Sequence, residues 1–274
     1  MTDSDIHEKL FNASSAGDDA LVRELLAADA DPQKYRDSCG DPALMEAFYR
    51  GKDSIVSIFI HSGADLNIQN KCGETVLYRA AVKGNNEVTA TLVEAGAELN
   101  IQDKDGYTAL HCAAVNGNNE VTQTLIEAGA DLNIKTIGGW TALHSTTENG
   151  NNEVTTTLIK AGADLNIQNN YGWTALYWAA GKGNNEVAKT LINAGADLNI
   201  QNNYGWTALN YAAAGVPFQT FQMFHLVLRI PVLVGYLIVF SAVFPSKYCG
   251  HWDIFCSKDC HTIPGAKMTT EPRL

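Results

Sequence analysis

Basic residues are scarce in residues 1–215 of this 274-residue chain. That stretch holds 14 lysines and arginines against 27 aspartates and glutamates, whereas the remainder holds five basic and three acidic residues. Contacts to a phosphate backbone need clustered Lys and Arg, so the composition argues against a nucleic-acid partner. The acidic balance favours solubility, and attraction of a basic protein partner is the alternative interpretation.

Catalytic and cofactor-binding motifs are also missing from the sequence. It contains no Gly-rich phosphate loop, no His-Glu-x-x-His pair and no Gly-x-Ser-x-Gly nucleophile motif. We therefore predict that the protein is not an enzyme and uses no cofactor. For the same reason we expect no small-molecule substrate.

Cysteine is used sparingly, and its spacing within residues 1–215 carries no metal signature. Cys39, Cys72 and Cys112 lie too far apart to match a zinc-binding pattern. The first residues show neither a basic start nor an apolar run, so no secretory signal is visible. We therefore expect this part of the chain to lie in the cytosol or nucleus, with its cysteines reduced.

A repeated block dominates what the sequence does contain. Gly-Ala-Asp-Leu-Asn begins at Gly63, Gly129, Gly162 and Gly195, and the variant Gly-Ala-Glu-Leu-Asn begins at Gly96, so the block recurs with a constant period of 33 in residue number. A fixed period between about 20 and 50 residues is typical of stacked-repeat proteins. Such proteins offer a partner a long face rather than one deep pocket.

A second signature, Gly-x-Thr followed by small residues, predicts the first helix of each repeat. The threonine stands where its hydroxyl can accept a backbone N–H as an N-cap. The glycine after the helix suits a left-handed C-cap. The threonines are Thr75, Thr108, Thr141, Thr174 and Thr207, and the glycines are Gly84, Gly117, Gly150 and Gly183.

An apolar stripe predicts a second helix in each repeat. After Gly-Asn-Asn-Glu-Val, the residues Val121, Leu125 and Ile126 recur at helical spacing. The following stretch is rich in turn residues and is long enough for a β-hairpin loop. One repeat therefore consists of helix, turn, helix and hairpin loop, and stacking of neighbours buries the apolar faces.

These features resemble the ankyrin repeat family. Its pattern Asp-x-x-Gly-x-Thr-Pro-Leu-His-x-Ala-Ala is matched closely by Asp103, Gly106, Thr108, Leu110, His111, Ala113 and Ala114. The resemblance extends over about residues 5 to 215 and rests on five consecutive copies in phase. Alanine replaces the helix-start proline in most copies. Thr146 and Thr147 replace the alanine pair in one repeat, where we expect β-branching to loosen the packing.

The resemblance implies an all-α solenoid of stacked ankyrin repeats, made of helix–turn–helix units with β-hairpin loops and followed by a C-terminal apolar helix. The pattern divides the chain into four parts. They are a degenerate N-terminal capping repeat (1–39), the repeat array with a truncated last repeat (40–215), an apolar segment (216–245), and a Cys- and His-containing tail that we expect to be disordered (246–274).

An aromatic column predicts where a partner would bind. In ankyrin proteins the position between Gly and Thr lies on the concave, partner-facing surface. Here that position is occupied by Glu74, Tyr107, Trp140, Trp173 and Trp206, and Tyr171 and Tyr204 lie two residues before the last two. Trp and Tyr provide large contact areas at low entropic cost. The alternative is that the rings only stack on one another or recur because the repeats are nearly identical.

Positions at the end of each first helix should line the same groove, because they vary where the rest of the repeat does not. They include Lys83, Asn116, Asn149 and Lys182. In this family the helix-start histidine, present here as His111 and His144, has a structural role in holding the helix start and neighbouring loops. Tyr78, Tyr177 and Asn210 occupy that position in other copies.

The repeat pattern stops after Gly215, and a strongly apolar run follows. Residues 226–244 carry a single charge, Arg229, and are a candidate transmembrane helix, although residues 230–244 alone are shorter than the ~20 residues that a bilayer requires. Three hypotheses remain open. The segment spans a membrane, it caps the last repeat as a helix, or it has no evolved role. For a cap, the residues on one helical face are Phe218, Phe221, His225 and Leu228.

The sequence gives conflicting indications of how a membrane-spanning segment would be oriented. The missing secretory signal favours an array that faces the cytoplasm, whereas the basic residues that follow the segment favour the opposite orientation. Thiolates and imidazoles in the tail are suitable zinc ligands, but their spacing matches no established finger, and unpaired cysteines or one disulfide are the simpler interpretation. These tail residues are Cys249, His251, Cys256, Cys260 and His261.

The sequence thus predicts a non-catalytic protein–protein interaction module that uses the concave face of the array and is tethered to a membrane by residues 226–244. The alternative is a soluble scaffold or inhibitor whose apolar tail caps the array. The identity of the protein partner is not encoded in a recognisable way, because similar repeat surfaces bind unrelated targets.

Overall fold

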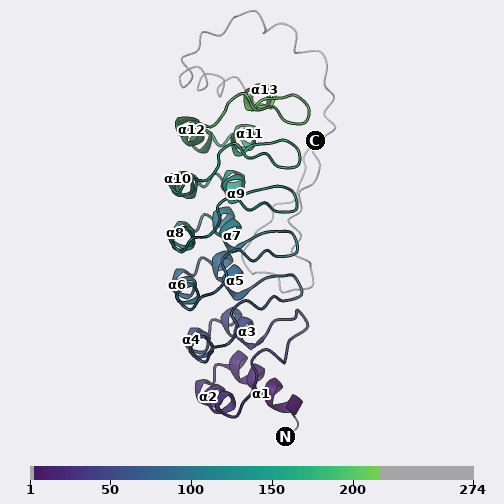
Figure 1. Ribbon diagram of the computed structural model, residues 1–274, viewed down its shortest axis with the longest axis vertical. Coiled ribbons are helices and arrows are strands. Elements are labelled where there is room, and N and C mark those ends of the chain that lie inside the picture. The colour runs from purple at the N-terminus through teal and green to yellow at the C-terminus, as the bar shows by residue number, and fades with distance from the viewer. Residues whose placement is uncertain (1–2, 216–274) are drawn as a thin grey trace, which may run out of the picture. The chain divides into compact units, whose positions relative to one another are not determined.

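The computed structural model of the protein describes residues 3–215. Expectations that concern residues 216–274 lie outside this range. Helices joined by loops make up the described part (Figure 1). Its helices are α1 (Asp3–Ala16), α2 (Asp19–Ala27), α3 (Ala43–Tyr49), α4 (Asp53–His61), α5 (Val76–Lys83), α6 (Asn86–Glu94), α7 (Ala109–Asn116), α8 (Asn119–Glu127), α9 (Ala142–Asn149), α10 (Asn152–Lys160), α11 (Ala175–Lys182), α12 (Asn185–Asn193) and α13 (Ala208–Gly215).

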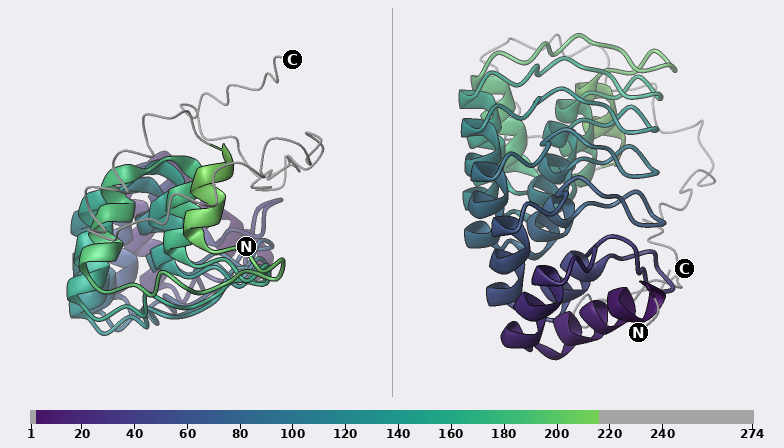
Figure 2. Two further views of the ribbon diagram at one scale, coloured as in Figure 1. Left: turned by 90° about the horizontal axis from the view of Figure 1, so that it is seen from above. Right: turned by 60° about the horizontal axis from the view of Figure 1, so that its bottom comes forward.

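The helices alternate between two columns. The first helices of the repeats, which have odd numbers, stack in one column, and the second helices stack in the other (Figure 1). A loop joins each second helix to the next first helix and projects to one side of the stack (Figure 2). We call these loops fingers. The predicted solenoid of helix–turn–helix units is confirmed for the described residues.

Local capping explains where the first helices begin and end. The Thr75 hydroxyl accepts a hydrogen bond from the Tyr78 N–H at 3.1 Å, and Thr174 caps α11 in the same way through Tyr177. The glycine after each helix adopts a left-handed conformation, with φ of 69° at Gly84 and 73° at Gly183. Both predicted caps are therefore present.

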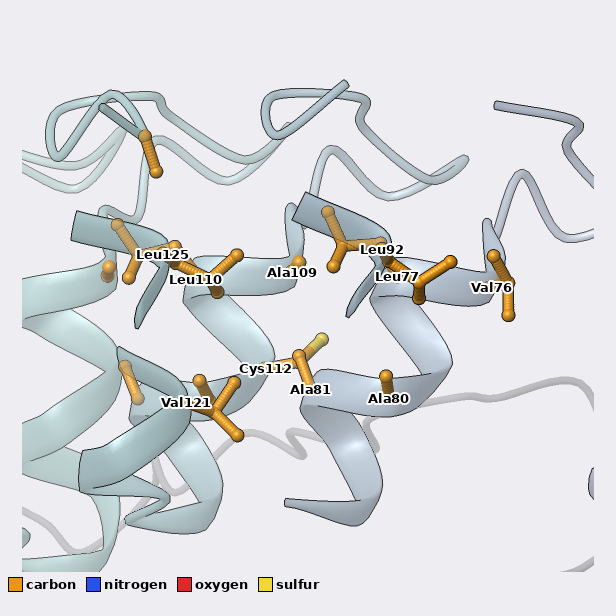
Figure 3. Packing of buried hydrophobic residues seen from close by; sticks show 14 of the residues in the cluster. Val76, Leu77, Ala80, Ala81, Leu92, Ala109, Leu110, Cys112, Val121 and Leu125 are labelled. Carbon is orange, nitrogen blue, oxygen red and sulfur yellow. The ribbon is translucent and has the colours of Figure 1, made fainter. Parts of the chain in front are cut away.

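The core consists of the same positions in every repeat. Leu77, Leu110 and Leu143 are each 1 % exposed, and the alanines of the first helices are buried beside them. Figure 3 shows this packing around α5 to α8, with Leu92 and Leu125 of the second helices directed toward the first helices. Alanine at these contacts lets neighbouring helices approach closely, so stacking rather than a single repeat buries the apolar surface.

The fingers differ from the predicted hairpins, because no finger within residues 3–215 contains a β-ladder. The described chain has one isolated bridge, between Arg36 and Pro42. Each finger is closed by two backbone bonds, as from the Asn169 N–H to the Trp173 carbonyl and from the Gly172 N–H to the Asn169 carbonyl, both at 2.9 Å. The Asn169 side-chain oxygen accepts two further N–H groups, and this side chain takes the place of ladder partners.

Adjacent fingers are joined by hydrogen bonds that recur with the repeat. The Asn203 N–H donates to the Tyr171 carbonyl at 3.1 Å. The Gln168 amide donates both to Gly172 in its own finger and to Gln201 in the next, at 2.7 and 2.9 Å. Because each finger bonds to its neighbour, these bonds fix the spacing between equivalent residues of adjacent fingers.

The two threonines of α9 are accommodated without an unsatisfied hydroxyl. Thr146 and Thr147 are fully buried and donate to the carbonyls of Leu143 and His144 at 2.8 and 2.6 Å. Thr155 of α10 donates in turn to the Thr146 hydroxyl at 2.8 Å. The expectation that these residues loosen the repeat concerns its dynamics and stays a prediction.

Candidate functional site

His111 and His144 connect one repeat to the next. The Thr108 N–H approaches His111 Nδ1 at 3.2 Å, and His111 Nε2 lies 3.1 Å from the Trp140 carbonyl. A backbone N–H can only donate and a carbonyl can only accept, so Nε2 carries the proton in this neutral ring. His144 repeats the arrangement with Thr141 and with the Trp173 carbonyl. The predicted structural role of both histidines is therefore confirmed.

Burial explains the acid–base behaviour of these histidines. Desolvation lowers the pKa of His111 and of His144 to about 4, against the partly opposing hydrogen bonds to backbone carbonyls. Both rings are therefore neutral at physiological pH. They position the fingers and are not available as general bases or metal ligands.

Other residues at the same position serve the same purpose with different chemistry. The Tyr177 hydroxyl accepts a hydrogen bond from the Asn202 amide in the next finger at 2.9 Å. Asn210 accepts the Thr207 N–H at 3.0 Å, as the histidine nitrogen does elsewhere. The side chain at this position thus holds the helix start in the repeats of His111, His144 and Asn210, and in the repeats of His111, His144 and Tyr177 it reaches the following finger.

Aromatic side chains gather where the last fingers meet the first helices. We call this set the aromatic cluster, and it consists of Trp140, Tyr171, Trp173, Tyr177, Trp178 and Tyr211. The rings of Trp173 and Trp178 stack with centroids 5.0 Å apart, and Trp140 meets Trp178 edge to face at 5.1 Å. Such contacts add to the stabilisation from burial alone.

The members of the cluster differ in exposure. Trp140 is only 9 % exposed, so the expectation of an open aromatic column is not met at this residue. It is covered because Trp178, which comes from the following repeat, packs against its ring. Tyr171 is 40 % exposed and stacks on Trp173 at 5.1 Å. Tyr107, Trp173 and Trp206 are half-buried.

Large exposed hydrophobic side chains of the described residues lie at the same end of the array. In the described residues the large hydrophobic side chains that are exposed are Ile137 (70 %), Tyr171 (40 %), Tyr204 (74 %) and Leu209 (42 %). The first three lie in consecutive fingers. A concentrated apolar surface of this kind commonly marks an interaction site.

Sequence reasoning missed Trp178, Tyr211 and Ile137. Trp178 and Tyr211 occupy the helix position that is held by Arg79, Cys112 and Ser145 in earlier repeats. Their departure from the pattern was the available signal, because an unusual aromatic residue at one repeat position indicates a local requirement rather than the framework.

The predicted residues at the helix ends are engaged within the chain. Lys83 donates to the carbonyls of Phe48 and Tyr49 at 3.2 and 3.1 Å, and burial lowers its pKa. Asn149 donates to the Val115 carbonyl at 2.8 Å, so it too caps the helix of the preceding repeat. Asn116 bonds within its own helix, to Cys112 at 2.9 Å.

Lys182 joins the aromatic cluster electrostatically. Its ammonium lies 4.9 Å from the centroid of the Trp178 ring, within the range of a cation–π contact. The side chain remains exposed. Of the four predicted helix-end residues, Lys182 is therefore the one that lies beside the cluster.

The N-terminal half of the same surface is polar and internally paired. Glu74, which holds the position of the tryptophans, forms an ion pair with Arg79 at 2.7 Å. Asn70 donates to Glu74 and to Asp41, both at 2.8 Å. Burial raises the pKa of Asp41, although the nearby guanidinium opposes this shift. The Arg79 guanidinium thus pairs with both carboxylates within the chain.

Metal binding and membrane insertion find no support within residues 3–215. This part of the chain contains no group of three or more His, Cys, Asp and Glu side chains that could hold a metal ion. None of its helices is both long enough and apolar enough to cross a bilayer. The apolar segment 226–244 and the cysteines and histidines of the tail lie beyond the described residues.

Comparison with known proteins identifies the architecture. A family model described as ankyrin repeats (three copies) matches residues 10–103, 44–136, 91–169 and 143–224. No curated protein matches the chain. Among 624 matching solved chains is the crystal structure of the ankyrin repeat domain of Bcl-3, described as a unique member of the IkappaB protein family. It is 26 % identical, with a TM-score of 0.68, and the match covers 74 % of this chain and 93 % of that chain.

Proposed function

Since the chain belongs to the ankyrin repeat family, whose repeats typically form protein–protein interaction modules, we propose that it binds a protein partner through the surface around the aromatic cluster. This role needs no catalytic group, and no catalytic family matches the chain. The partner itself is not indicated by any similarity.

The observation that carries the proposal is that, within residues 3–215, the exposed large hydrophobic side chains lie in the last three repeats. Tyr171 and Tyr204 present rings from adjacent fingers, and Lys182 lies nearby on α11. Tyr171 is already ordered by stacking on Trp173, so it should lose little entropy when a partner covers it. Trp173 packs against Tyr171 and against Trp140. Tyr107 and Trp206 occupy the repeat position of these two tryptophans, and Asn116 and Asn149 occupy the repeat position of Lys182.

The test replaces the two exposed tyrosines and leaves the buried tryptophans in place. Proteins captured from a cell extract by the immobilised chain should be retained by the wild type and lost with Tyr171→Ser plus Tyr204→Ser. Because each ring can act as a hot spot, we expect recovery to fall by at least about tenfold. Changing Trp140 instead would confuse binding with folding, since that ring is buried.

A matched control changes two exposed side chains on the second helices, Lys160→Ser plus Lys189→Ser. This variant should capture the same proteins as the wild type. Undiminished recovery with the tyrosine variant, at unchanged helicity, would show that the partner binds elsewhere.

We also propose that residues 226–244 tether the array to a membrane, with the array on the cytoplasmic side. Support comes from the apolar composition of this segment, in which Arg229 is the single charged residue. A soluble array whose tail packs on its own repeats is the alternative.

Alkaline carbonate extraction of expressing cells separates these two states. The full chain should stay in the membrane pellet, and Val234→Glu plus Leu237→Glu should release it, because charges in the hydrocarbon core are costly. The control Ser246→Glu plus Ser257→Glu adds the same charge outside the segment and should remain in the pellet. A wild-type chain found in the supernatant would leave the soluble alternative.

A further inference from the structure

The last fingers place their exposed apolar side chains in a row along the array. Ile137, Tyr171 and Tyr204 belong to three consecutive fingers, and each is exposed. Tyr171 stacks on Trp173, which holds the ring in place. We call these three side chains the apolar row. Each of these described fingers contributes one large exposed hydrophobic side chain, so the row is narrow and runs from repeat to repeat.

The spacing along the apolar row equals one repeat. The first helices α9, α11 and α13 stack on one another in one column (Figure 1). Helices that pack in this way have axes about 8–10 Å apart. The fingers keep this spacing because they bond to one another, as from the Asn203 N–H to the Tyr171 carbonyl. The backbones at Tyr171 and Tyr204, which occupy equivalent positions, are therefore separated by about 8–10 Å along the array.

We propose that a proline-rich segment of the protein partner, in the polyproline II conformation, binds along the apolar row. This inference rests on the proposed protein-binding function and specifies the chemistry of the partner. A polyproline II helix rises about 3.1 Å per residue with about three residues per turn, so one turn is about 9 Å long. One turn therefore spans one repeat. Prolines at positions i, i+3 and i+6 of the segment each lie over one member of the apolar row.

The chemistry of this surface suits proline. Pyrrolidine rings are apolar, and proline-rich segments dock in aromatic-lined grooves. Proline has no backbone N–H, so such a segment has few donors that lose water when it covers apolar rings. Residues 165–215 hold two basic and two acidic side chains, so this end of the array offers no net charge to attract an acidic or a basic segment. A segment that is already extended also loses little entropy on binding.

Two other common modes of peptide binding do not match the apolar row. Addition of a β-strand requires an exposed sheet edge. The fingers of residues 3–215 contain no β-ladder, and adjacent fingers use backbone groups to bond to one another. An amphipathic helix lays a broad apolar stripe into a groove, with anchors at i, i+3, i+4 and i+7. The apolar row is one side chain wide and offers no such groove.

Fluorescence anisotropy with a labelled oligoproline of about nine residues, which forms about three turns, tests the proposal on the full chain. The peptide should bind saturably, whereas a labelled Gly-Ser peptide of the same length should not. Tyr171→Ser plus Tyr204→Ser should weaken binding by about tenfold or more, because both rings are lost. Tyr171→Phe plus Tyr204→Phe keeps the rings and should change the affinity by less than about threefold.

Lys160→Ser plus Lys189→Ser, on the second helices, is the matched control and should bind oligoproline as the wild type does. Because oligoproline carries no side-chain charge, its affinity should change by less than about twofold between low and high salt. Absence of saturable binding would overturn the proposal, as would equal binding by the wild type and the Tyr171→Ser plus Tyr204→Ser variant.

Competition separates failure of this proposal from failure of the proposed function. Oligoproline should release the proteins that the immobilised wild-type chain captures from a cell extract, whereas the Gly-Ser peptide should not. If capture depends on Tyr171 and Tyr204 but oligoproline does not compete with it, the proposed function stands and the proline-rich chemistry is wrong. If capture is independent of both tyrosines, the proposed function fails as well.

Discussion

A single side chain per repeat, three residues after the capping threonine, joins each helix start to the next finger in three successive repeats. His111 and His144 do so as neutral rings with the proton on Nε2. Tyr177 does so through its hydroxyl. The requirement at this position is a side chain long enough to reach the neighbouring finger, rather than one particular chemical group.

The buried histidines make the stability of the array sensitive to acid. The pKa of each is about 4 in the folded chain and about 6.5 when unfolded, so between these values the unfolded chain binds protons that the folded chain does not. The free energy of unfolding should therefore be highest above pH 6.5 and fall toward pH 4. The loss is up to about 1.4 kcal/mol per pH unit for each histidine. Urea unfolding across this pH range measures it.

The double variant His111→Asn plus His144→Asn isolates this effect from that of the carboxylates. Asn210 shows that asparagine can accept the same threonine N–H. The variant should be less stable at neutral pH but should lose less stability on acidification. An equal pH slope in both chains would show that the histidines are not responsible.

At this scale the sequence predicted what is local and missed what comes from a neighbouring repeat. The threonine and glycine caps follow from residues within one helix, and they are present as expected. The burial of Trp140 depends on Trp178, which belongs to the following repeat. No pattern within one repeat could reveal that contact.

Between elements, the packing of α13 on α11 depends on a glycine that faces a large aromatic side chain. Gly181 of α11 leaves room for Tyr211 of α13, because a Cβ atom at residue 181 would collide with the tyrosine ring. The freed space lets Tyr211 stack on Tyr177 with centroids 4.7 Å apart. Aromatic stacking thus joins the last two first helices in addition to their buried alanines.

Gly181→Ala should destabilise the array even though alanine favours helix more than glycine does. The new methyl group collides with Tyr211, and overpacking of this kind costs about 1–3 kcal/mol. In a Tyr211→Ala background the collision is absent, so the same change should stabilise by up to about 1 kcal/mol. Thermal unfolding of the wild type, the two single variants and the double variant measures this double-mutant cycle. A destabilisation of equal size in both backgrounds would exclude the tyrosine as its cause.

Element types were predictable because helical periodicity and end signals agree in each copy. The conformation of the fingers was less predictable, since their turn residues and their length favoured β-hairpins. The structure closes them with asparagine or aspartate side chains and with bonds to the next finger. Such bonds depend on the stacking of repeats and have no signature in a single loop.

Across the whole chain, charge is distributed unevenly. Residues 1–164 hold 12 basic and 25 acidic side chains, whereas residues 165–215 hold two of each. The aromatic cluster and the exposed tyrosines lie largely in the neutral part. Self-repulsion is therefore concentrated in the earlier repeats, and the surface proposed to bind a partner is nearly free of net charge.

Replacing Glu94 and Glu127 by lysine should stabilise the array at low ionic strength. Both residues end second helices, where negative charge opposes the helix dipole, and α10 already ends with Lys160. Each change should add about 0.3–1 kcal/mol. Because the net charge falls from −11 to −7, unfolding of the variant should also depend less on salt. Melting curves at low and high salt for both chains measure this, and an unchanged salt dependence would count against self-repulsion.

The contacts between repeats recur with identical partners. Thr124 donates to Asn86, Thr157 to Asn119 and Thr190 to Asn152, each at 2.6–2.7 Å. One whole repeat unit inserted between two of these repeats would meet complementary surfaces on both sides. Gain or loss of a whole copy, as by unequal recombination within the coding sequence, would therefore preserve these recurrent contacts. The length of the array can therefore change by whole repeats, because each repeat contacts only its neighbours.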